Sequence, residues 1–489
     1  MKNILRHYIE EFNQNDEELY QNAIDNAHAY EWLEDRIPLL ECSDKELEMT
    51  YYFRWWTYRK HVKSTDDGWV ITEFLPPVPW AGKHNVINAA AGHHFYEGRW
   101  LRDSEELFCD YLNFLLDNGD ISHKYSSWLL DAAVAYESVG RDLSVNSETL
   151  SKMLSYYERW EKEHLLENGM FWSLDGRDAM EFSISGTKGG KPVKGIRPTL
   201  NAYMVAEARA IAAYAEKLDK EKTAAEYHGK AKTLEKKMIQ NLVFDGFFKA
   251  VHGNCDADIE NAFDVCDHEH NPRELIGYIP YIFGIHSLGD EKCFKLLSDY
   301  NVFAAKTGLA TADISHAEYL GKFDHECLWN GYVWPFATSQ TLMALLRVIR
   351  EGHVEYKPLF ANLMLQYSDM HRIEKDGVRL PWIDEVMSPN ERVWTARALL
   401  EKWGWQESLG GKERGKDYNH STFCDLVISG IFGVKCDSEA LECDPIIPAG
   451  WEYARLDNLY YRGRLYTITY DRTGERYGKG AGFFVELKA

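Results

Sequence analysis

Six stretches of the chain place aromatic residues beside carboxylates, arginines or histidines. Aromatic faces stack on the apolar C–H faces of sugar rings, while charged and amide groups bind sugar hydroxyls. A single stretch of this kind is readily explained by packing, because Arg–carboxylate pairs and tryptophans also tie loops together. Six in one chain favour a carbohydrate-binding pocket. The stretches are Tyr51–His61, Gly92–Asp103, Trp172–Gly186, Trp329–Pro335, Leu380–Trp394 and Tyr418–Asp425.

Two of these stretches carry carboxylates suited to cleaving a glycosidic bond. That reaction needs one carboxyl with a raised pKa to protonate the leaving oxygen, and a second to activate water or attack directly. Asp175, Asp178 and Glu181 recur every three residues, so on a helical turn they share a face and raise one another's pKa. Glu385 lies in a predicted loop after a proline. The residues alone leave open which of the first three is the acid.

Charge and composition restrict the partners of the chain. It has 489 residues and a formal charge of −22, because 77 Asp and Glu outnumber 55 Lys and Arg. Phosphate binding needs a basic face, so nucleic acid and an anionic membrane are not expected partners. The first twenty residues lack the apolar core of a signal peptide, and no stretch has the roughly 18 apolar residues of a membrane span. We therefore expect a cytoplasmic protein whose partner is a small carbohydrate.

The nine cysteines form no CxxC pair, which fits free thiols in a reducing compartment. Cys266, His268, Glu269 and His270 lie together in the segment VCDHEH, but no second ligand pair follows at zinc-finger spacing. We expect neither a metal nor a cofactor. The absence of G-x-S-x-G and G-x-x-x-x-G-K-[ST] motifs sets aside serine-nucleophile and phosphate chemistry.

Helical periodicity dominates the chain to about residue 440. The helices occur mostly in pairs joined by glycine-containing loops, and about ten to twelve are expected, two of them between residues 125 and 165. No alternation of strands and helices supports a parallel sheet. The economical arrangement is an all-α ring of helix pairs, an (α/α)6 toroid, whose loops at one end define a pocket. The clearest segments are Thr199–Lys217, Ala224–Met238, Cys293–Tyr300, Ser339–Arg350, Lys357–Met370 and Val393–Lys402.

The last fifty residues change character. Apolar and polar residues alternate over Arg464–Tyr470, and the turn signal Asp471–Gly474 and a glycine-rich segment follow. These patterns predict a short C-terminal antiparallel β unit packed on the helical body. We divide the chain into a catalytic domain over residues 1–440 and this β unit over residues 441–489.

The order of the aromatic stretches resembles six-hairpin glycosidases built like mannosylglycerate hydrolase, trehalase and processing α-glucosidase I. Those enzymes carry an Asp in a loop before a long helix, here LDGRDAMEFSISG before RPTLNAYMVAEARAIAAYAEKL. A W-R-G-P-x-W-like segment follows, here WNGYVWP, and then a Glu before a turn, here DEVMSPNERVW. The resemblance implies Asp178 as acid and Glu385 as base. Because the first motif departs from the family pattern, Asp175 and Glu181 remain alternatives for the acid.

The resemblance also implies the reaction. It points to an inverting, exo-acting α-glycosidase of gluco or manno type, acting on small soluble glycosides or oligosaccharides. Inversion needs a water between base and sugar, so the two carboxyls should stand roughly 6.5–9.5 Å apart. Asn330 replaces the family's arginine, which leaves the sugar open. Ten residues are expected near the sugar: Arg54, Trp55, Arg99, Trp100, Asp103, Trp329, Asn330, Trp334, Trp382 and His420.

Two alternatives to this reaction stay open. A sugar epimerase or isomerase on the same toroid would use histidines for proton transfer, and His93, His94 and His420 are available for it. A glycosidase for another sugar, such as an L-arabinofuranoside, is the other alternative. Release of a free reducing sugar supports hydrolysis, whereas interconversion of isomers without bond cleavage supports the epimerase.

Overall fold

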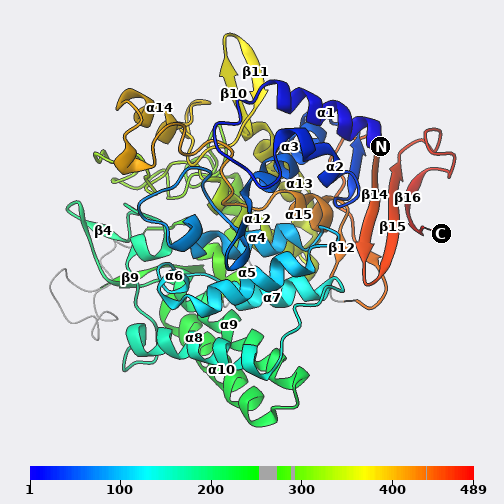
Figure 1. The fold of residues 1–489 in the computed structure, drawn as a ribbon. Helices are drawn as coiled ribbons and strands as arrows, with labels where there is room; N and C mark the ends of the chain where they lie inside the picture. Colours follow the sequence, from blue (N-terminus) through cyan, green and yellow to red (C-terminus); the bar gives the residue numbers. More distant parts are fainter. Residues whose placement is uncertain (253–271, 288–291, 437, 489) are drawn as a thin grey trace.

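Most of the chain is helical in the computed structural model, which describes residues 1–252, 272–287, 292–436 and 438–488 (Figure 1). Most of the helices expected from periodicity are confirmed, although Cys293–Tyr300 forms the 3-10 helix η8 (Lys292–Ser298) instead of an α-helix. The α-helices are α1 (Lys2–Gln14), α2 (Ala29–Leu33), α3 (Lys45–His61), α4 (Ala91–Gly98), α5 (Glu105–Asp117), α6 (Gly119–Ser122), α7 (Leu129–Ser138), α8 (Ser147–His164), α9 (Pro198–Lys217), α10 (Glu221–Leu242), α11 (Ile279–Ile282), α12 (Pro335–Arg350), α13 (Lys357–Met370), α14 (Thr395–Lys402) and α15 (Cys424–Leu426).

Six helices form a closed inner ring. Each contacts the next in the order α4, α7, α9, α11, α12, α15, and α15 returns to α4. Both α9 and α12 are buried on nearly all sides, as expected for helices enclosed by others, and each begins with a proline in its first turn. Each inner helix is preceded in the chain by an outer one: α3, α5, α8, α10, η8 and α13. The predicted (α/α)6 toroid is confirmed.

Polar contacts join the first inner helix to the last and so close the ring. The Glu97 carboxylate on α4 accepts hydrogen bonds from the backbone N–H groups of Phe423, Cys424 and Asp425, at the start of α15. Arg99 donates in turn to the Asp425 carboxylate at 2.6 and 2.9 Å. A carboxylate at a helix N-terminus satisfies otherwise unpaired N–H groups, so these contacts also fix where α15 begins.

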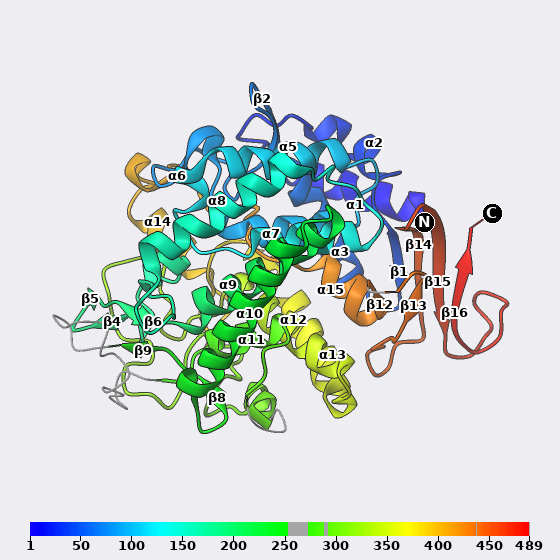
Figure 2. The same ribbon diagram turned by 90° about the horizontal axis from the view of Figure 1, so that it is seen from below.

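The predicted C-terminal antiparallel β unit is confirmed, and it lies at one side of the helical body (Figures 1 and 2). Its strands run in the order β1 (Leu39–Cys42), β14 (Tyr453–Tyr461), β15 (Arg464–Asp471), β16 (Gly482–Leu487). Leu40, Leu456 and Ile468 pair across the strands and are buried, which is the alternation that the sequence predicts. The first strand comes from the N-terminal part of the chain. The domain boundary at residue 440 remains a prediction.

Short two-stranded antiparallel sheets lie in the loops. They pair β2 (Val62–Thr65) with β3 (Gly68–Ile71), β4 (Thr187–Lys188) with β5 (Lys191–Pro192), β6 (Gly195–Ile196) with β9 (Val251–His252), β7 (Val243–Phe244) with β8 (Phe247–Phe248), β10 (Arg372–Lys375) with β11 (Val378–Pro381), and β12 (Val434–Lys435) with β13 (Glu442–Cys443).

Five connecting segments lead from an outer helix to the start of an inner helix. Because the inner helices are entered in this same sense around the ring, these loops gather at one end of it. Across the described ranges, no helix is both long and apolar enough to cross a membrane. The cluster from Cys266 to His270 lies outside the described residues. The loops that enter α4, α7, α9, α12 and α15 span residues 62–90, 118–128, 165–197, 299–334 and 371–423.

Candidate active site

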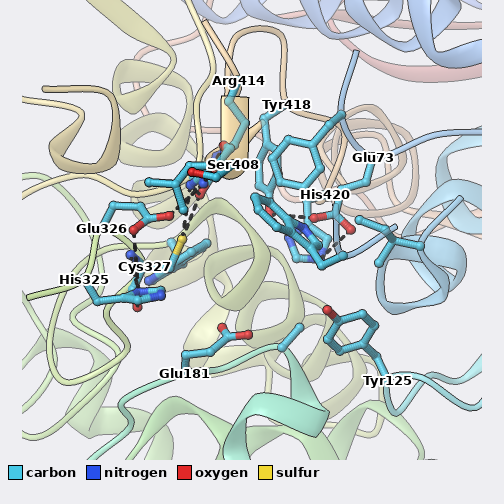
Figure 3. A pocket seen from close by; sticks show the side chains of 17 residues that line it. Glu73, Tyr125, Glu181, His325, Glu326, Cys327, Ser408, Arg414, Tyr418 and His420 are labelled. Carbon is cyan, nitrogen blue, oxygen red and sulfur yellow. Dashed lines mark hydrogen bonds and ion pairs between the residues drawn. The ribbon is translucent and has the colours of Figure 1, made fainter. Parts of the chain in front are cut away.

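These five loops enclose a cavity of about 300 Å³, which we call the first cavity (Figure 3). Every residue that lines it precedes an inner helix, so the toroid brings together side chains that are up to 347 positions apart in sequence, from residue 73 to residue 420. Four of the lining residues are glutamates. The lining comprises Glu73, Phe74, Trp80, Ile87, Tyr125, Ala179, Glu181, His325, Glu326, Cys327, Trp334, Glu385, Ser408, Leu409, Arg414, Tyr418 and His420.

Arg414 fixes two of the four glutamates. Its Nε and Nη2 donate to the two carboxylate oxygens of Glu385 at 2.7 and 2.8 Å, and its Nη1 donates to Glu326 at 2.7 Å. Burial raises the pKa of Glu326, but Arg414 outweighs burial and holds it below its ordinary value. The Cys327 thiol also donates to Glu385, with its sulfur 3.0 Å from Oε2. Bidentate pairing with a guanidinium orients Glu385 as a carboxylate at the cavity wall.

Glu181 stands across the open middle of the cavity from Arg414 (Figure 3). The backbone adopts left-handed φ angles at Ala179 (55°) and Phe182 (60°), so the chain turns sharply on both sides of Glu181. Burial, together with the neighbouring carboxylates Asp175, Glu385 and Glu326, raises the pKa of Glu181 to about 8. At neutral pH its carboxyl group therefore carries a proton.

Glu181 also lines a second cavity, of about 480 Å³. Tyr125 is the other residue common to both linings, so these two side chains stand where the cavities adjoin. Asp175 lines only the second cavity, and burial raises its pKa to about 6. The second cavity is lined by Lys124, Tyr125, Leu174, Asp175, Gly176, Arg177, Glu181, Phe182, Thr187, Gly190 and Pro192.

Asp178 lies beneath this site. The described residues that line the two cavities include Glu181 and Asp175 but not Asp178. Its buried carboxylate accepts hydrogen bonds from Arg197 Nε at 2.7 Å, Ser126 Oγ at 2.8 Å and Ser173 Oγ at 3.1 Å. These donors occupy both of its oxygens and anchor the acidic loop to the start of α9.

Removing the Asp178 carboxylate should destabilise the fold. Asp178→Ala leaves the fully buried Arg197 guanidinium without its ion-pair partner, because that pair is the 2.7 Å contact between Nε and Oδ2. We expect a loss of about 3–5 kcal/mol in the free energy of unfolding, seen as a lower midpoint in urea. The double variant Asp178→Ala/Arg197→Met should recover part of the loss, and an unchanged midpoint for the single variant would contradict this role.

Of the ten residues expected near the sugar, Trp334 and His420 line the first cavity. Trp329 lies behind Trp334, with parallel rings 4.5 Å apart at the centroids, and its backbone N–H donates to the Glu181 carbonyl at 3.1 Å. Asn330 is buried next to it and donates from its side-chain amide to the Gly321 carbonyl. The WNGYVWP stretch thus supplies the cavity-lining indole of Trp334 and the Trp329 indole that packs behind it.

The other six lie away from the described lining of the first cavity, and five of them are buried. Arg54 donates to the side chain and carbonyl of Ser421. Arg99 and Trp100 both donate to Asp425. These contacts hold the start of α15 against the helix pair α3 and α4. The remaining members are Trp55, which is buried, Asp103, which is exposed at a turn, and Trp382, which lies under Arg397.

Several lining residues were not singled out from the sequence. Glu326 and Cys327 precede WNGYVWP with only Leu328 between them, and Tyr418 belongs to the stretch that supplied His420, so their neighbours in sequence were available as a signal. Glu73 and Arg414 lie in segments with no distinctive pattern. Only their position in the folded ring marks them.

Residues 83–421 match the family described as the mannosylglycerate hydrolase MGH1-like glycoside hydrolase domain. The chain belongs to this family. It is therefore a glycoside hydrolase, and the resemblance seen in its aromatic stretches is confirmed. Residues 434–488 match the C-terminal domain of glycosyl hydrolase family 65.

Solved structures agree with this assignment. A structure described as a sialidase is 33% identical and superposes with a TM-score of 0.86 over 98% of this chain. The chain spans 42% of the length of that protein. No curated protein sequence matches the chain.

Two more distant structures were also found. A mannosylglycerate hydrolase from Thermus thermophilus in complex with glucose is 11% identical, with a TM-score of 0.48 over 72% of this chain and 99% of its own. An α-L-rhamnosidase from Dictyoglumus thermophilum is 12% identical, with a TM-score of 0.49 over 90% of this chain and 43% of its own. Both TM-scores are below 0.5, so the fold assignment rests on the sialidase structure.

Proposed function

We propose that the chain removes a terminal sugar from small glycosides or oligosaccharides with inversion, using Glu181 as general acid and Glu385 as general base. The observation that carries this proposal is the position of Glu181. A general acid must stand at the scissile bond, between the sugar and its leaving group. Glu181 is a protonated carboxyl at the place where two cavities adjoin, and it faces a fixed carboxylate across one of them. Asp178 is absent from the described linings of both cavities and is bound by Arg197 and Ser126, so it is better suited to support the loop.

The proposed reaction follows from this arrangement. The terminal sugar occupies the first cavity, against Trp334, and the leaving group occupies the second. Glu181 gives its proton to the glycosidic oxygen as the bond to the anomeric carbon breaks. A water on the opposite face attacks that carbon, and Glu385 takes the proton that the water loses. Glu181 ends ionised and Glu385 ends protonated, and exchange with solvent restores both.

The product anomer tests the proposal. A panel of nitrophenyl glycosides, including α-glucosides, α-mannosides and L-arabinofuranosides, identifies the sugar, and proton NMR of the first turnovers shows which anomer is released. We expect the anomer opposite to that of the substrate. Release of the same anomer would instead indicate two displacements with a covalent intermediate. Isomer formation without cleavage would favour the epimerase alternative, for which His420 is the histidine in the cavity.

The raised pKa of Glu181 predicts the alkaline limb of activity. Because the group must be protonated to act, and its pKa is raised to about 8, kcat/KM should be at its plateau near pH 7 and fall tenfold per pH unit well above 8. A pH profile of the wild type measures this limb. In Glu181→Gln the residual activity should no longer fall at alkaline pH. If it still falls, another group is responsible for the alkaline limb.

The described cysteines support the cytoplasm as the proposed compartment. Among the described residues, Cys42, Cys109, Cys327, Cys424, Cys436 and Cys443 are free thiols. Thiols persist unpaired in reducing compartments.

A further inference from the structure

Glu73, Tyr418 and His420 form one wall of the first cavity, away from Glu181 (Figure 3). All three side chains are buried. The Tyr418 hydroxyl donates to Glu73 Oε1 at 3.1 Å and also contacts His420 Nδ1 in a short hydrogen bond. Tyr418 therefore links the carboxyl group to the imidazole.

The two outer atoms of this group have no partner. Glu73 Oε2 and His420 Nε2 are buried atoms without a hydrogen bond to any described residue. They lie 3.7 Å apart, too far to bond each other but close enough for one oxygen atom to bond both. A buried polar atom left unpaired costs free energy, so two of them side by side at a cavity wall indicate a place for a polar ligand atom.

The hydrogen-bond pattern fixes which outer atom donates. A hydroxyl has one proton, and Tyr418 gives it to Glu73, so His420 Nδ1 must donate to the Tyr418 oxygen. Burial lowers the pKa of His420 well below its ordinary value, so the ring is neutral and Nε2 is a bare acceptor. Burial also raises the pKa of Glu73 well above its ordinary value. Since Oε1 accepts from Tyr418, the carboxyl proton belongs on Oε2.

We propose that Glu73 and His420 together bind one hydroxyl group of the terminal sugar. The sugar oxygen accepts a hydrogen bond from Glu73 Oε2–H and donates its own proton to His420 Nε2. With the two bonds through Tyr418, this closes a ring of four hydrogen bonds in which each group donates once and accepts once. The inference rests on the proposed function, because it requires the first cavity to hold the sugar.

This arrangement makes the wall a specificity determinant. A sugar that lacks the hydroxyl would leave both protein atoms buried and unpaired, and sites built to bind a hydroxyl reject such analogues strongly. Glu73 is not placed to act as the acid, since it lines the first cavity but is absent from the described lining of the second.

Two substitutions at position 73 separate this role from acid–base catalysis. In Glu73→Gln the amide N–H replaces Oε2–H, and the amide oxygen still accepts from Tyr418. We expect kcat/KM to stay within about fivefold of the wild type on the best nitrophenyl glycoside. Glu73→Ala removes both contacts and should lower kcat/KM by about 100-fold or more. His420→Asn, which loses the acceptor at the Nε2 position, should behave like Glu73→Ala.

The kcat/KM values for monodeoxy analogues of that glycoside distinguish hydroxyl binding by Glu73 from a purely structural role. One analogue should be a poor substrate for the wild type, and Glu73→Ala should lower its kcat/KM little further, because the contact is already missing. Tyr111→Phe is the matched control. It removes a similar buried Tyr–His hydrogen bond, 3.0 Å between Tyr111 and His94, outside the described lining of the cavity, and it should leave kcat/KM unchanged.

The possible failures are distinguishable. Should the wild type cleave none of the glycosides, the proposed function is overturned and this inference with it. The wild type could instead cleave a glycoside while Glu73→Gln is as impaired as Glu73→Ala and both variants keep the wild-type melting temperature. That result would overturn only the inference. The inference alone would also be overturned if, for every monodeoxy analogue, the loss in kcat/KM from the missing hydroxyl and the loss from Glu73→Ala were additive.

Discussion

Glu181→Gln should lower kcat by about 10²–10⁴-fold on a glycoside with a poor leaving group, such as a methyl glycoside or a disaccharide. It should lower kcat far less on a 2,4-dinitrophenyl glycoside of the same sugar. A poor leaving group departs only when its oxygen is protonated, whereas dinitrophenolate leaves unaided. The glutamine keeps the shape of the side chain but has no acidic proton to transfer. Steady-state kinetics on the two substrates measures the difference.

Two neighbouring aspartates serve as controls for this prediction. Asp178→Asn keeps the volume of a carboxylate that lies below the cavity, and Asp175→Asn alters one that lines only the second cavity. Neither should show a loss that depends on the leaving group. If Asp178→Asn shows that dependence while Glu181→Gln remains active on the disaccharide, the acid is Asp178.

The choice between Asp178 and Glu181 depends on a backbone detail that the sequence does not show. A spacing of three residues predicts that Asp175, Asp178 and Glu181 share a helical face. The 3-10 turn η4 (Asp175–Asp178) instead ends at Asp178, and the left-handed φ of Ala179 turns Glu181 into the cavities. Left-handed conformations are usual for glycine and uncommon for alanine, so nothing at position 179 signals the turn.

The helical ring, in contrast, is largely predictable. The apolar spacing and Pro198 mark α9 to within one residue, and α13 has the predicted bounds. Such helices are specified by local sequence, because their burial requires apolar residues every three or four positions. Pairs of them joined by loops leave few arrangements other than a ring.

Arginines in aromatic stretches were harder to assign. Arg54 and Arg99 lie in segments typical of sugar binding, but they contact Ser421 and Asp425, more than 320 positions later. Arg414 lies in a segment without such a pattern, yet it orients Glu385. The local sequence does not tell which arginine closes the ring and which orients a carboxylate in the cavity, because only the fold supplies the partner.

Glu385→Gln should lower kcat on both kinds of substrate, unlike Glu181→Gln, whose effect depends on the leaving group. Without a carboxylate to take its proton, the attacking water is a weak nucleophile, so kcat should fall by about 10²–10⁴-fold on both the disaccharide and the dinitrophenyl glycoside. Glu326→Gln is the matched control, since it removes the negative charge paired with the same Arg414 but keeps the proposed base. We expect it to lose less than about tenfold.

Azide then tests whether Glu385 acts on the attacking water. The azide anion attacks without losing a proton, so it needs no base and fits the place of the water. Added to Glu385→Gln, it should restore release of dinitrophenolate and yield a glycosyl azide of inverted anomer, identified by NMR. A glycosyl azide with the anomer of the substrate would mean that azide opens a covalent intermediate formed on another residue. Glu385 would then be the acid–base residue of a retaining enzyme and not the base of an inverting one.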